Sequence, residues 1–322
     1  MKKLLICGLG SIGRRYLRII RNNWPLLEIG ILRSGKGPNY SEKDLADVQF
    51  TTIQDAIRWG PNTAIIATPA SSHLKQAITL AKEGISLLIE KPIGIGNEPS
   101  EKWNQLILLS REIPILLGYC LRHDPCAHYI QKQLQQKYLG MIIEADFYCG
   151  SWLPSWRPEL DYLKSVSSRK ELGGGVLLEL SHELDLANWL IGPFNLTAAS
   201  INSSDLFPID VEDQAILLGK NINNTLITIR LNFCSNPSKR IISFRGEKGE
   251  LNWDVENGTV EKILSDHPVK KMKLGITRDD LFINQLKHFF SCYNKESNPN
   301  CTIVDGLNVL KLVKEANLLS LK

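Results

Sequence analysis

One stretch of the chain combines glycines with a histidine and acidic residues at spacings that suit acid–base chemistry. It begins at Gly173-Gly174-Gly175 and ends at Asp185. If it forms a helix after a glycine turn, residues three apart are neighbours, which places Glu179 and Asp185 beside His182. A histidine held by acidic neighbours can transfer protons near neutral pH, although a histidine in surface ion pairs gives the same pattern. No second histidine follows at the spacing of a zinc-protease motif.

A lysine follows a predicted buried strand, 85–89, in the run Glu90-Lys91-Pro92. Open α/β sheets bind their ligands at the carboxyl ends of parallel strands. A lysine at that edge can donate a proton or a hydrogen bond to a reacting oxygen. Taken alone, the run also fits a surface lysine before a turn.

A glycine-rich turn lies near the start of the chain. The run Gly8-Leu9-Gly10-Ser11-Ile12-Gly13 stands between a predicted strand, 3–7, and a predicted helix, 11–22. In this motif the first glycine makes a tight turn, and the second lets the backbone approach a pyrophosphate. The third glycine lets the helix pack closely on the strand, and the helix start offers N–H groups to the anion. The turn therefore predicts a dinucleotide site.

The end of the second predicted strand, 27–32, bears on which dinucleotide binds. Folds that bind NAD keep an acidic residue here for the ribose hydroxyls, whereas this chain has Arg33 and Ser34. A guanidinium and a hydroxyl suit a 2′-phosphate, so the sequence favours NADP(H), with NAD as the alternative. An arginine on a solvated loop would give the same sequence.

The elements that must position these residues fall into two regions. Over residues 1–119, short apolar runs alternate with amphipathic stretches, which predicts a dinucleotide-binding domain with a parallel, doubly wound sheet. Over residues 120–303, runs such as Thr225–Phe233 alternate apolar and polar residues, which predicts an α+β domain with an open, mostly antiparallel sheet. A last helix, 304–321, is expected to pack back on the first domain.

Composition excludes several other classes of protein. The 322 residues are 43% hydrophobic and 22% charged, which is typical of a globular protein. The net charge of +4 is spread without the basic stripe of a nucleic-acid-binding surface. No apolar run approaches the roughly 18 residues of a membrane helix, and the apolar start is too short for a signal peptide. Seven scattered cysteines argue against a disulfide framework, so we expect a soluble, cytoplasmic protein.

Taken in order, these motifs resemble the Gfo/Idh/MocA family of nicotinamide-dependent enzymes, which includes glucose–fructose oxidoreductase and inositol dehydrogenase. The resemblance spans nearly the whole chain and also rests on Thr68-Pro69 and on Gly118–Arg122. It implies a Rossmann domain followed by an open antiparallel sheet domain. It further implies that Lys91 and His182 act at the reacting carbon. One departure is Leu178, which stands where many relatives have an acidic residue.

The motifs and the resemblance together define a predicted site. The predicted catalytic residues are Lys91, His182, Asp185 and Glu179. The predicted cofactor residues are Gly8, Gly10, Ser11, Ile12, Gly13, Arg33, Ser34, Thr68, Pro69, His73, Glu90 and Lys91. The predicted substrate residues are Tyr119, Arg122, Trp156, Arg157 and Tyr162, and no metal site is expected. The aromatic and basic residues of segment 150–172 suit a sugar, and they equally suit a lid or a subunit contact.

These predictions describe an NADP(H)-preferring oxidoreductase. It would move a hydride between the nicotinamide and a carbinol or ketone carbon of a sugar, cyclic polyol or sugar nucleotide. We expect a homo-oligomer, either a dimer or a tetramer, that binds neither nucleic acid nor membranes. Two alternatives stay open, namely a dinucleotide-binding sensor or scaffold without turnover and a glycoside hydrolase that oxidises its substrate transiently with NAD⁺.

Overall fold

The computed structural model describes residues 1–35, 40–158, 161–265 and 267–320. Contacts within the chain divide it into two compact units. The first unit is Met1–Cys120 with Arg278–Gly306, and the second is Leu121–Thr277 with Leu307–Lys322. The end of the first segment lies one residue beyond the predicted boundary at 119. Segment 278–306 groups with the first unit, whereas the sequence placed it almost entirely in the second domain.

The first unit contains a six-stranded parallel sheet in the order β3-β2-β1-β4-β5-β6. Its strands are β1 (Lys3–Cys7), β2 (Glu28–Leu32), β3 (Val48–Phe50), β4 (Thr63–Ile66), β5 (Ser86–Ile89) and β6 (Ile115–Leu117). All the residues of β4, β5 and β6 are buried, as expected for strands covered on both faces. The order reverses between β1 and β4, which is the switch point where dinucleotide-binding folds place their ligand. The prediction of a doubly wound parallel sheet is confirmed.

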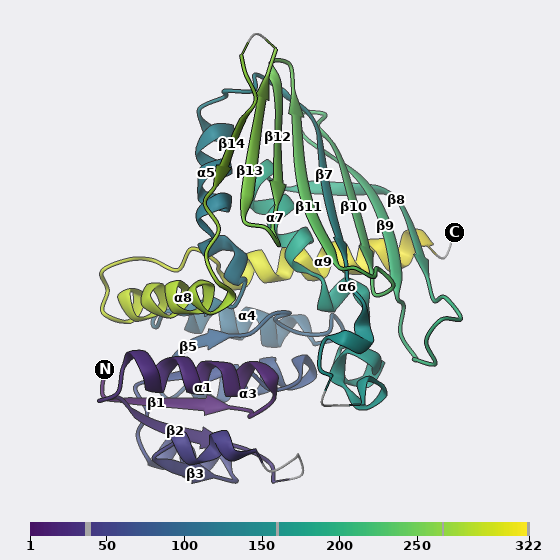
Figure 1. The fold of residues 1–322 in the computed structure, drawn as a ribbon. Coiled ribbons are helices and arrows are strands. Elements are labelled where there is room, and N and C mark those ends of the chain that lie inside the picture. The colour runs from purple at the N-terminus through teal and green to yellow at the C-terminus, as the bar shows by residue number, and fades with distance from the viewer. Residues whose placement is uncertain (36–39, 159–160, 266, 321–322) are drawn as a thin grey trace. The chain divides into compact units, whose positions relative to one another are not determined.

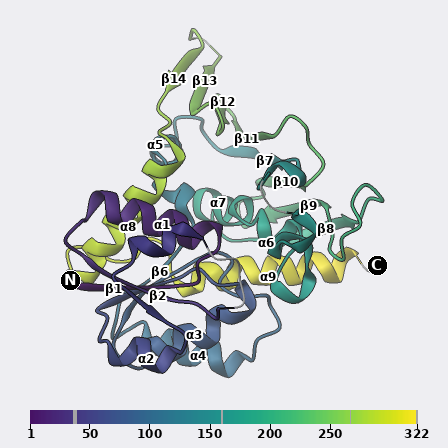
Figure 2. The same ribbon diagram turned by 60° about the horizontal axis from the view of Figure 1, so that its bottom comes forward.

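Helices cover both faces of this sheet. They are α1 (Ser11–Asn23), α2 (Ile53–Arg58), α3 (His73–Ala81), α4 (Ser100–Leu109) and α8 (Arg278–Tyr293), with short 3₁₀ turns η1 (Ser41–Leu45) and η2 (Ala70–Ser72). Figure 2 shows α1 and α8 on one face and α3 and α4 on the other. Strand β3 and helices α2 and α8 were not predicted from the sequence. Helix α8 could have been predicted, because its apolar residues recur at helical spacing. They are Leu281, Phe282, Leu286, Phe289 and Phe290.

The second unit contains an eight-stranded sheet in the order β14-β13-β12-β11-β7-β10-β9-β8 (Figure 1). Its strands are β7 (Ile142–Gly150), β8 (Phe194–Asn202), β9 (Gln214–Asn221), β10 (Leu226–Asn232), β11 (Lys239–Gly246), β12 (Gly249–Asp254), β13 (Thr259–Leu264) and β14 (Lys270–Lys273). Neighbouring strands are antiparallel except β7 and β10, which are parallel. The predicted open, mostly antiparallel sheet is confirmed.

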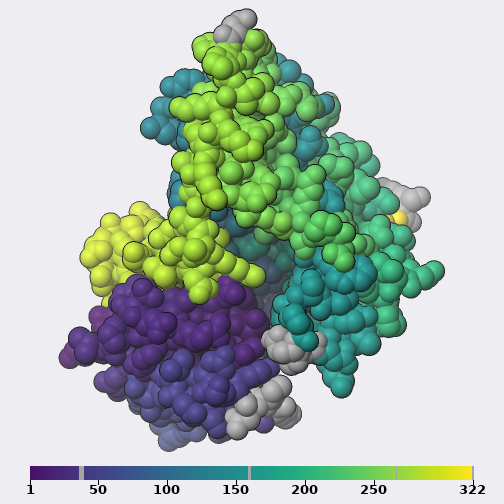
Figure 3. Space-filling model, in the orientation of Figure 1, coloured from purple at the N-terminus to yellow at the C-terminus, as the bar shows by residue number. Residues whose placement is uncertain are grey.

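One face of this sheet is packed and the other is open. The helices of this unit are α5 (Pro125–Gln135), α6 (Val176–Glu179), α7 (His182–Ile191) and, from Leu307 onward, α9 (Ile303–Ser320). Helices α6 and α7 pack on the middle strands, against buried residues such as Phe147, Ile229 and Leu231. The opposite face carries the exposed side chains of Ile216, Leu218 and Leu226. This face turns toward the viewer in Figure 3.

Both edges of the sheet are protected against pairing with another chain. At β8, the backbone N–H groups of Leu196 and Ile201 donate to Glu315 and Ser320 of α9. At the other edge, β14 consists of three lysines and a methionine. Helix α9 groups with the second unit from Leu307 onward, which differs from the predicted return to the first domain. Among the described residues no helix is both long and apolar enough to span a membrane.

Candidate functional site

The glycines of the turn in the first unit have two different roles, one in the fold and one in leaving space for a ligand. At Gly8, φ is +96° and a Cβ atom would lie 2.7 Å from the carbonyl oxygen of Ala67. A Cβ atom on Gly13 would lie 2.0 Å from the carbonyl oxygen of Gly8. A Cβ atom on Gly10 would meet nothing within 4 Å. The fold therefore requires Gly8 and Gly13, whereas the space at Gly10 is open to a ligand.

The start of α1 is electrostatically suited to a diphosphate. Ser11 and Ile12 open the helix and are half-buried, and no acidic residue lies in the first turn. The N–H groups and the positive end of the helix dipole therefore meet no competing carboxylate from that turn. The residues of this turn fit the phosphates of a dinucleotide.

Basic residues lie at the turn that follows β2 and at the start of α1. Arg33 is half-buried, its backbone N–H donates to the carbonyl of Phe50 over 3.0 Å, and Ser34 is exposed. Arg14, which follows Gly13 directly, was not among the predicted site residues. Its guanidinium lies 3.8 Å from the ring centre of Tyr40 and donates to Glu42 over 3.1 Å. An arginine directly after the third glycine of the motif is the sequence feature that could have indicated a second basic residue here.

His73 connects the loops that follow β4 and β5. Its side chain is buried, with Nδ1 2.9 Å from the carbonyl oxygen of Pro92 and Nε2 2.8 Å from that of Thr68. Burial lowers the pKa of His73, whereas the two carbonyl acceptors favour the protonated ring. A neutral ring donates to only one carbonyl at a time. His73 thus links the carbonyl directly before Pro69 to the carbonyl of Pro92, the residue after Lys91.

Glu90, directly before Lys91, belongs to a buried hydrogen-bond network. Tyr16 of α1 donates to Glu90 Oε1 over 2.5 Å, and Gln285 of α8 donates to the Tyr16 hydroxyl over 2.6 Å. Burial raises the pKa values of both Glu90 and Tyr16. The Lys91–Pro92 peptide bond is cis. The network anchors the residue before Lys91 to two helices, and no local sequence pattern indicates the part that Gln285 has in it.

The segment around His182 forms two helices rather than one. Gly173 and Gly175 adopt φ values of +88° and +102° before α6, which ends at Glu179. Leu180 and Ser181 interrupt the helix, and α7 begins at His182. The predicted helical spacing between Glu179 and His182 is therefore wrong, because the two residues belong to different helices. Glu179 accepts a hydrogen bond from the Ser167 hydroxyl over 3.1 Å.

Two bidentate ion pairs hold the first turn of α7. Asp185 accepts from Arg122 Nε over 2.9 Å and from Nη2 over 2.6 Å, and the two side chains are 1% and 2% exposed. Glu183, which is fully buried, accepts from Arg240 Nε over 2.6 Å and from Nη2 over 2.9 Å. The structure thus joins two predicted site residues, Arg122 and Asp185, to each other. The Glu183–Arg240 pair was missed, because residues 57 positions apart leave no local pattern.

The aromatic residues of segment 150–172 pack within the second unit. Trp156 meets Phe233 edge to face with ring centres 5.2 Å apart, and its Nε1 donates to the Ser151 hydroxyl over 2.7 Å. Tyr162 packs on Phe207 at 5.9 Å. A cavity of only about 10 Å³ lies beside Trp156, Arg157 and Tyr162, which is room for a single water. In the first unit, Tyr119 is also buried, with 1% of its surface exposed.

Two family models match consecutive parts of the chain. The model for the NAD-binding Rossmann fold of an oxidoreductase family, GFO_IDH_MocA, matches residues 2–113. The model for the C-terminal alpha/beta domain of the same family matches residues 131–317. The chain belongs to the Gfo/Idh/MocA oxidoreductase family. Among the described residues, no cluster of three or more histidine, cysteine or acidic side chains could hold a metal ion.

Two curated relatives within the Gfo/Idh/MocA family are distant from this chain. The rhizopine catabolism protein MocA of Rhizobium meliloti is 24% identical over 173 residues, which are 52% of this chain and 51% of MocA. The scyllo-inositol 2-dehydrogenase (NAD(+)) of Bacillus subtilis is 25% identical over 197 residues, 58% of this chain and 53% of that enzyme. The chain thus matches about half the length of these curated relatives.

Solved structures of the Gfo/Idh/MocA family share the fold of this chain. A structure of levoglucosan dehydrogenase in complex with NADH and levoglucosan has a TM-score of 0.85. The match covers 99% of this chain and 97% of that chain at 16% sequence identity. At this identity the likeness extends to the fold, and the chemistry must be argued from the residues of this chain.

Proposed function

We propose that the protein is a nicotinamide-dependent oxidoreductase that transfers a hydride to or from a carbinol or ketone carbon of a sugar-like substrate. The observation that carries this proposal is the turn of Gly8, Gly10 and Gly13 at the switch point of the β3-β2-β1-β4-β5-β6 sheet. Its open position at Gly10 and the start of α1 fit the phosphates of a dinucleotide. Membership of an oxidoreductase family whose Rossmann model is described as NAD-binding supports the same conclusion.

The residues of the two units would divide the chemistry between them. When bound, the nicotinamide supplies the hydride acceptor or donor. Lys91 would donate a hydrogen bond or a proton to the substrate oxygen, and His182 would relay that proton. Both roles are carried over from the family resemblance. The hydrogen bonds of Glu90, directly before Lys91, and the ion pairs in the first turn of α7, where His182 lies, support fixed backbone positions for these two residues. Because Asp185 is paired with Arg122, we assign it to positioning α7 rather than to accepting a proton.

The substrate class and the cofactor preference rest on different observations. The names of the relatives, an inositol dehydrogenase and a levoglucosan dehydrogenase, support a cyclic polyol or a sugar. Arg33 and Ser34 after β2 support NADP(H), because a guanidinium can pair with a 2′-phosphate. The relatives named with NAD or NADH support the alternative cofactor. A homo-oligomer and a cytoplasmic location stay predictions from the sequence.

The proposal is tested by substitution of Lys91. The purified chain is screened with NADP⁺ and NAD⁺ against inositols, hexoses, sugar acids and sugar nucleotides, with short-chain alcohols as the comparison. Lys91→Met should lower kcat on the best substrate by about 10²–10⁴-fold and leave nucleotide affinity nearly unchanged. Lys82→Met, an exposed lysine of the same unit, serves as the matched control and should keep full activity. A Lys91→Met enzyme with more than about a tenth of the wild-type kcat would remove this lysine from the chemistry.

A further inference from the structure

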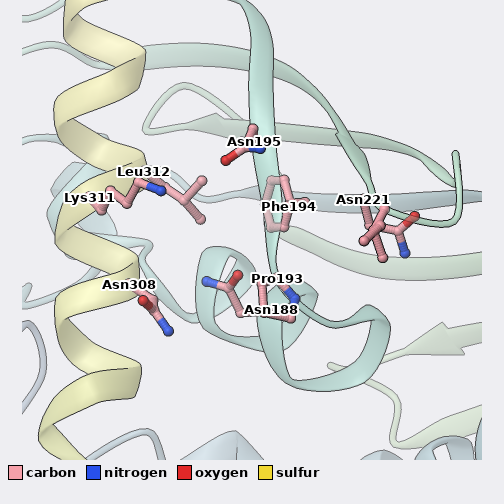
Figure 4. A pocket seen from close by; sticks show the side chains of 9 residues that line it. Asn188, Pro193, Phe194, Asn195, Asn221, Asn308, Lys311 and Leu312 are labelled. Carbon is pink, nitrogen blue, oxygen red and sulfur yellow. The ribbon is translucent and has the colours of Figure 1, made fainter.

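A cavity of about 320 Å³ lies within the second unit, and none of its lining residues belongs to the predicted site. It opens where the end of α7, the start of β8, the end of β9 and the middle of α9 come together (Figure 4). Its volume is at the lower end of the range for ligand pockets, which is roughly 300–1,000 Å³. A molecule the size of a single sugar ring would fit such a space.

Asn188, near the end of α7, places an unsatisfied polar atom at this cavity. Its side-chain nitrogen Nδ2 is buried, and within the described parts of the chain it has no acceptor. Buried amide groups in folded proteins almost always have a hydrogen-bond partner. In Figure 4 this amide points into the space between β8 and α9. An acceptor supplied by a ligand would satisfy it.

The other asparagines of the cavity differ in what their amides already bind. Asn221 already binds the protein through both ends of its amide, because its Nδ2 donates to the carbonyl of Ile191 and its Oδ1 accepts from two backbone N–H groups. Asn195 on β8 and Asn308 on α9 lie on opposite walls of the cavity (Figure 4). Each amide offers both donors and an acceptor, as a hydroxyl group does. The walls therefore match a ligand that presents several hydroxyl groups.

The charge at the cavity favours a neutral ligand. Among the described residues that line it, Lys311 alone is charged, and its ammonium lies 3.6 Å from Glu315, one helical turn later on α9. The cation is therefore already paired, and an anionic ligand would compete with Glu315 for it. Phe194 and Leu312 add apolar surface, against which the C–H groups of a sugar or cyclitol ring can pack.

We propose that this cavity binds a small neutral polyhydroxylated molecule, of monosaccharide or cyclitol size, at a site separate from the catalytic one. The ligand would accept a hydrogen bond from Asn188 and exchange hydrogen bonds with Asn195 and Asn308. Asn188 lies six residues after His182 on α7, or roughly 9 Å along the helix axis, so the two positions are distinct. The proposal requires no turnover and does not rest on the proposed function.

The test measures binding of myo-inositol and of glucose to the full-length, nucleotide-free protein by calorimetric titration. Asn188→Leu and Asn308→Leu should each weaken binding at the cavity about tenfold, which is the effect of losing one well-formed hydrogen bond. Asn317→Leu is the matched control, because Asn317 is an exposed residue of α9 that does not line the cavity. This control should bind the probes like the wild type.

The outcomes separate this proposal from its alternatives. If neither probe binds, or if binding is unchanged in both cavity variants, the proposal is wrong. Inorganic phosphate that displaces the probes would show an anion site instead and would overturn the neutral class. If Asn188→Leu does not fold, Asn308→Leu alone decides the question. Absence of turnover on every sugar tested, with cavity binding intact, would reject the proposed function and leave this inference standing.

Discussion

The two units of the molecule position their functional groups by different means. In the first, the groups suited to the dinucleotide are largely backbone atoms, and Gly8, Gly10 and Gly13 act through conformation and small size. In the second, charged side chains are fixed by partners far along the chain. Arg122 and Asp185 are 63 residues apart, and Glu183 and Arg240 are 57 residues apart.

This difference determines how each unit should respond to substitution. A site built from backbone atoms is lost mainly when an added side chain blocks space or forces a dihedral angle. A site built on buried ion pairs is lost when one partner is removed, because the other charge stays buried without compensation. The following predictions test that contrast, and their expected effects decrease from the first to the last.

The largest effect is expected from breaking the Arg122–Asp185 pair. Arg122→Met keeps much of the side-chain volume but leaves the Asp185 carboxylate buried, so the free energy of unfolding should fall by about 3–5 kcal/mol. Denaturant unfolding followed by circular dichroism measures this change. Arg122→Met combined with Asp185→Leu should recover part of the loss, because no charge is then left unpaired.

The matched control for this prediction is an exposed arginine of the same unit. Arg245 pairs with Glu144 and Glu250, and its side chain is 49% exposed. Surface ion pairs contribute about 0–1 kcal/mol, so Arg245→Met should change the stability little. Equal effects of Arg122→Met and Arg245→Met would show that burial of the Arg122–Asp185 pair does not matter, and the contrast between the units would fail.

The features that could be predicted from the sequence are those that depend on neighbouring residues, as the glycine turn of the first unit does. The sheet of the first unit and its glycine turn were predictable, because buried parallel strands read as apolar runs and glycines at fixed spacing have a local cause. The alternation in Thr225–Phe233 likewise predicted a strand with one open face, which is β10. These features depend on residues that are close together in the sequence.

The features that could not be predicted depend on contacts between distant residues. The pairing of Glu183 with Arg240 and the Gln285–Tyr16–Glu90 network have no local pattern. The break at Leu180 and Ser181 went unpredicted because apolar residues continue on both sides of it. The side chain of Glu212 accepts from the N–H of Leu177 and so satisfies a backbone group at the start of α6, again from a residue far along the chain.

The second prediction concerns Arg33, which is an exception in the first unit because a side chain is assigned to the cofactor. If it pairs with a 2′-phosphate, the wild type should bind NADPH more tightly than NADH. Arg33→Ala should then reduce the preference by about 1.5–3 kcal/mol, the value of a charged hydrogen bond. Fluorescence titration of both nucleotides measures it, with the exposed Arg58→Ala as the control. Equal affinities in the wild type would reject the NADP(H) preference.

The third prediction separates the two roles of glycine. Gly10→Ala should leave the stability almost unchanged, because φ is −72° and the added Cβ atom meets nothing within 4 Å. It should nevertheless weaken nucleotide binding by about tenfold or more, since the methyl group would occupy the approach of the phosphates. Gly13→Ala should instead destabilise the unit, because its Cβ atom would lie 2.0 Å from a carbonyl oxygen. Unchanged nucleotide affinity in Gly10→Ala would place the phosphates elsewhere.

The smallest effect is expected at His73, where a side chain binds two backbone carbonyls. Burial lowers the pKa of His73 below its ordinary value of 6.5, despite the opposing influence of the carbonyls of Thr68 and Pro92 and of nearby Glu98. The unfolded chain therefore takes up a proton before the folded chain does. Stability should fall as the pH drops below about 6.5, by at most about 1.4 kcal/mol per pH unit.

The measurement is the free energy of unfolding between pH 8 and pH 5 for the wild type and two variants. His73→Gln keeps a donor for one carbonyl but cannot titrate, so its stability should lack this component of the pH dependence. His267→Gln, which changes an exposed histidine, should keep the wild-type pH profile. A wild type that instead gains stability relative to His73→Gln on acidification would show that the two carbonyls outweigh burial and hold the ring in its protonated form. In that case the backbone of the first unit, like the ion pairs of the second, would stabilise a buried charge, and the contrast between the units would narrow.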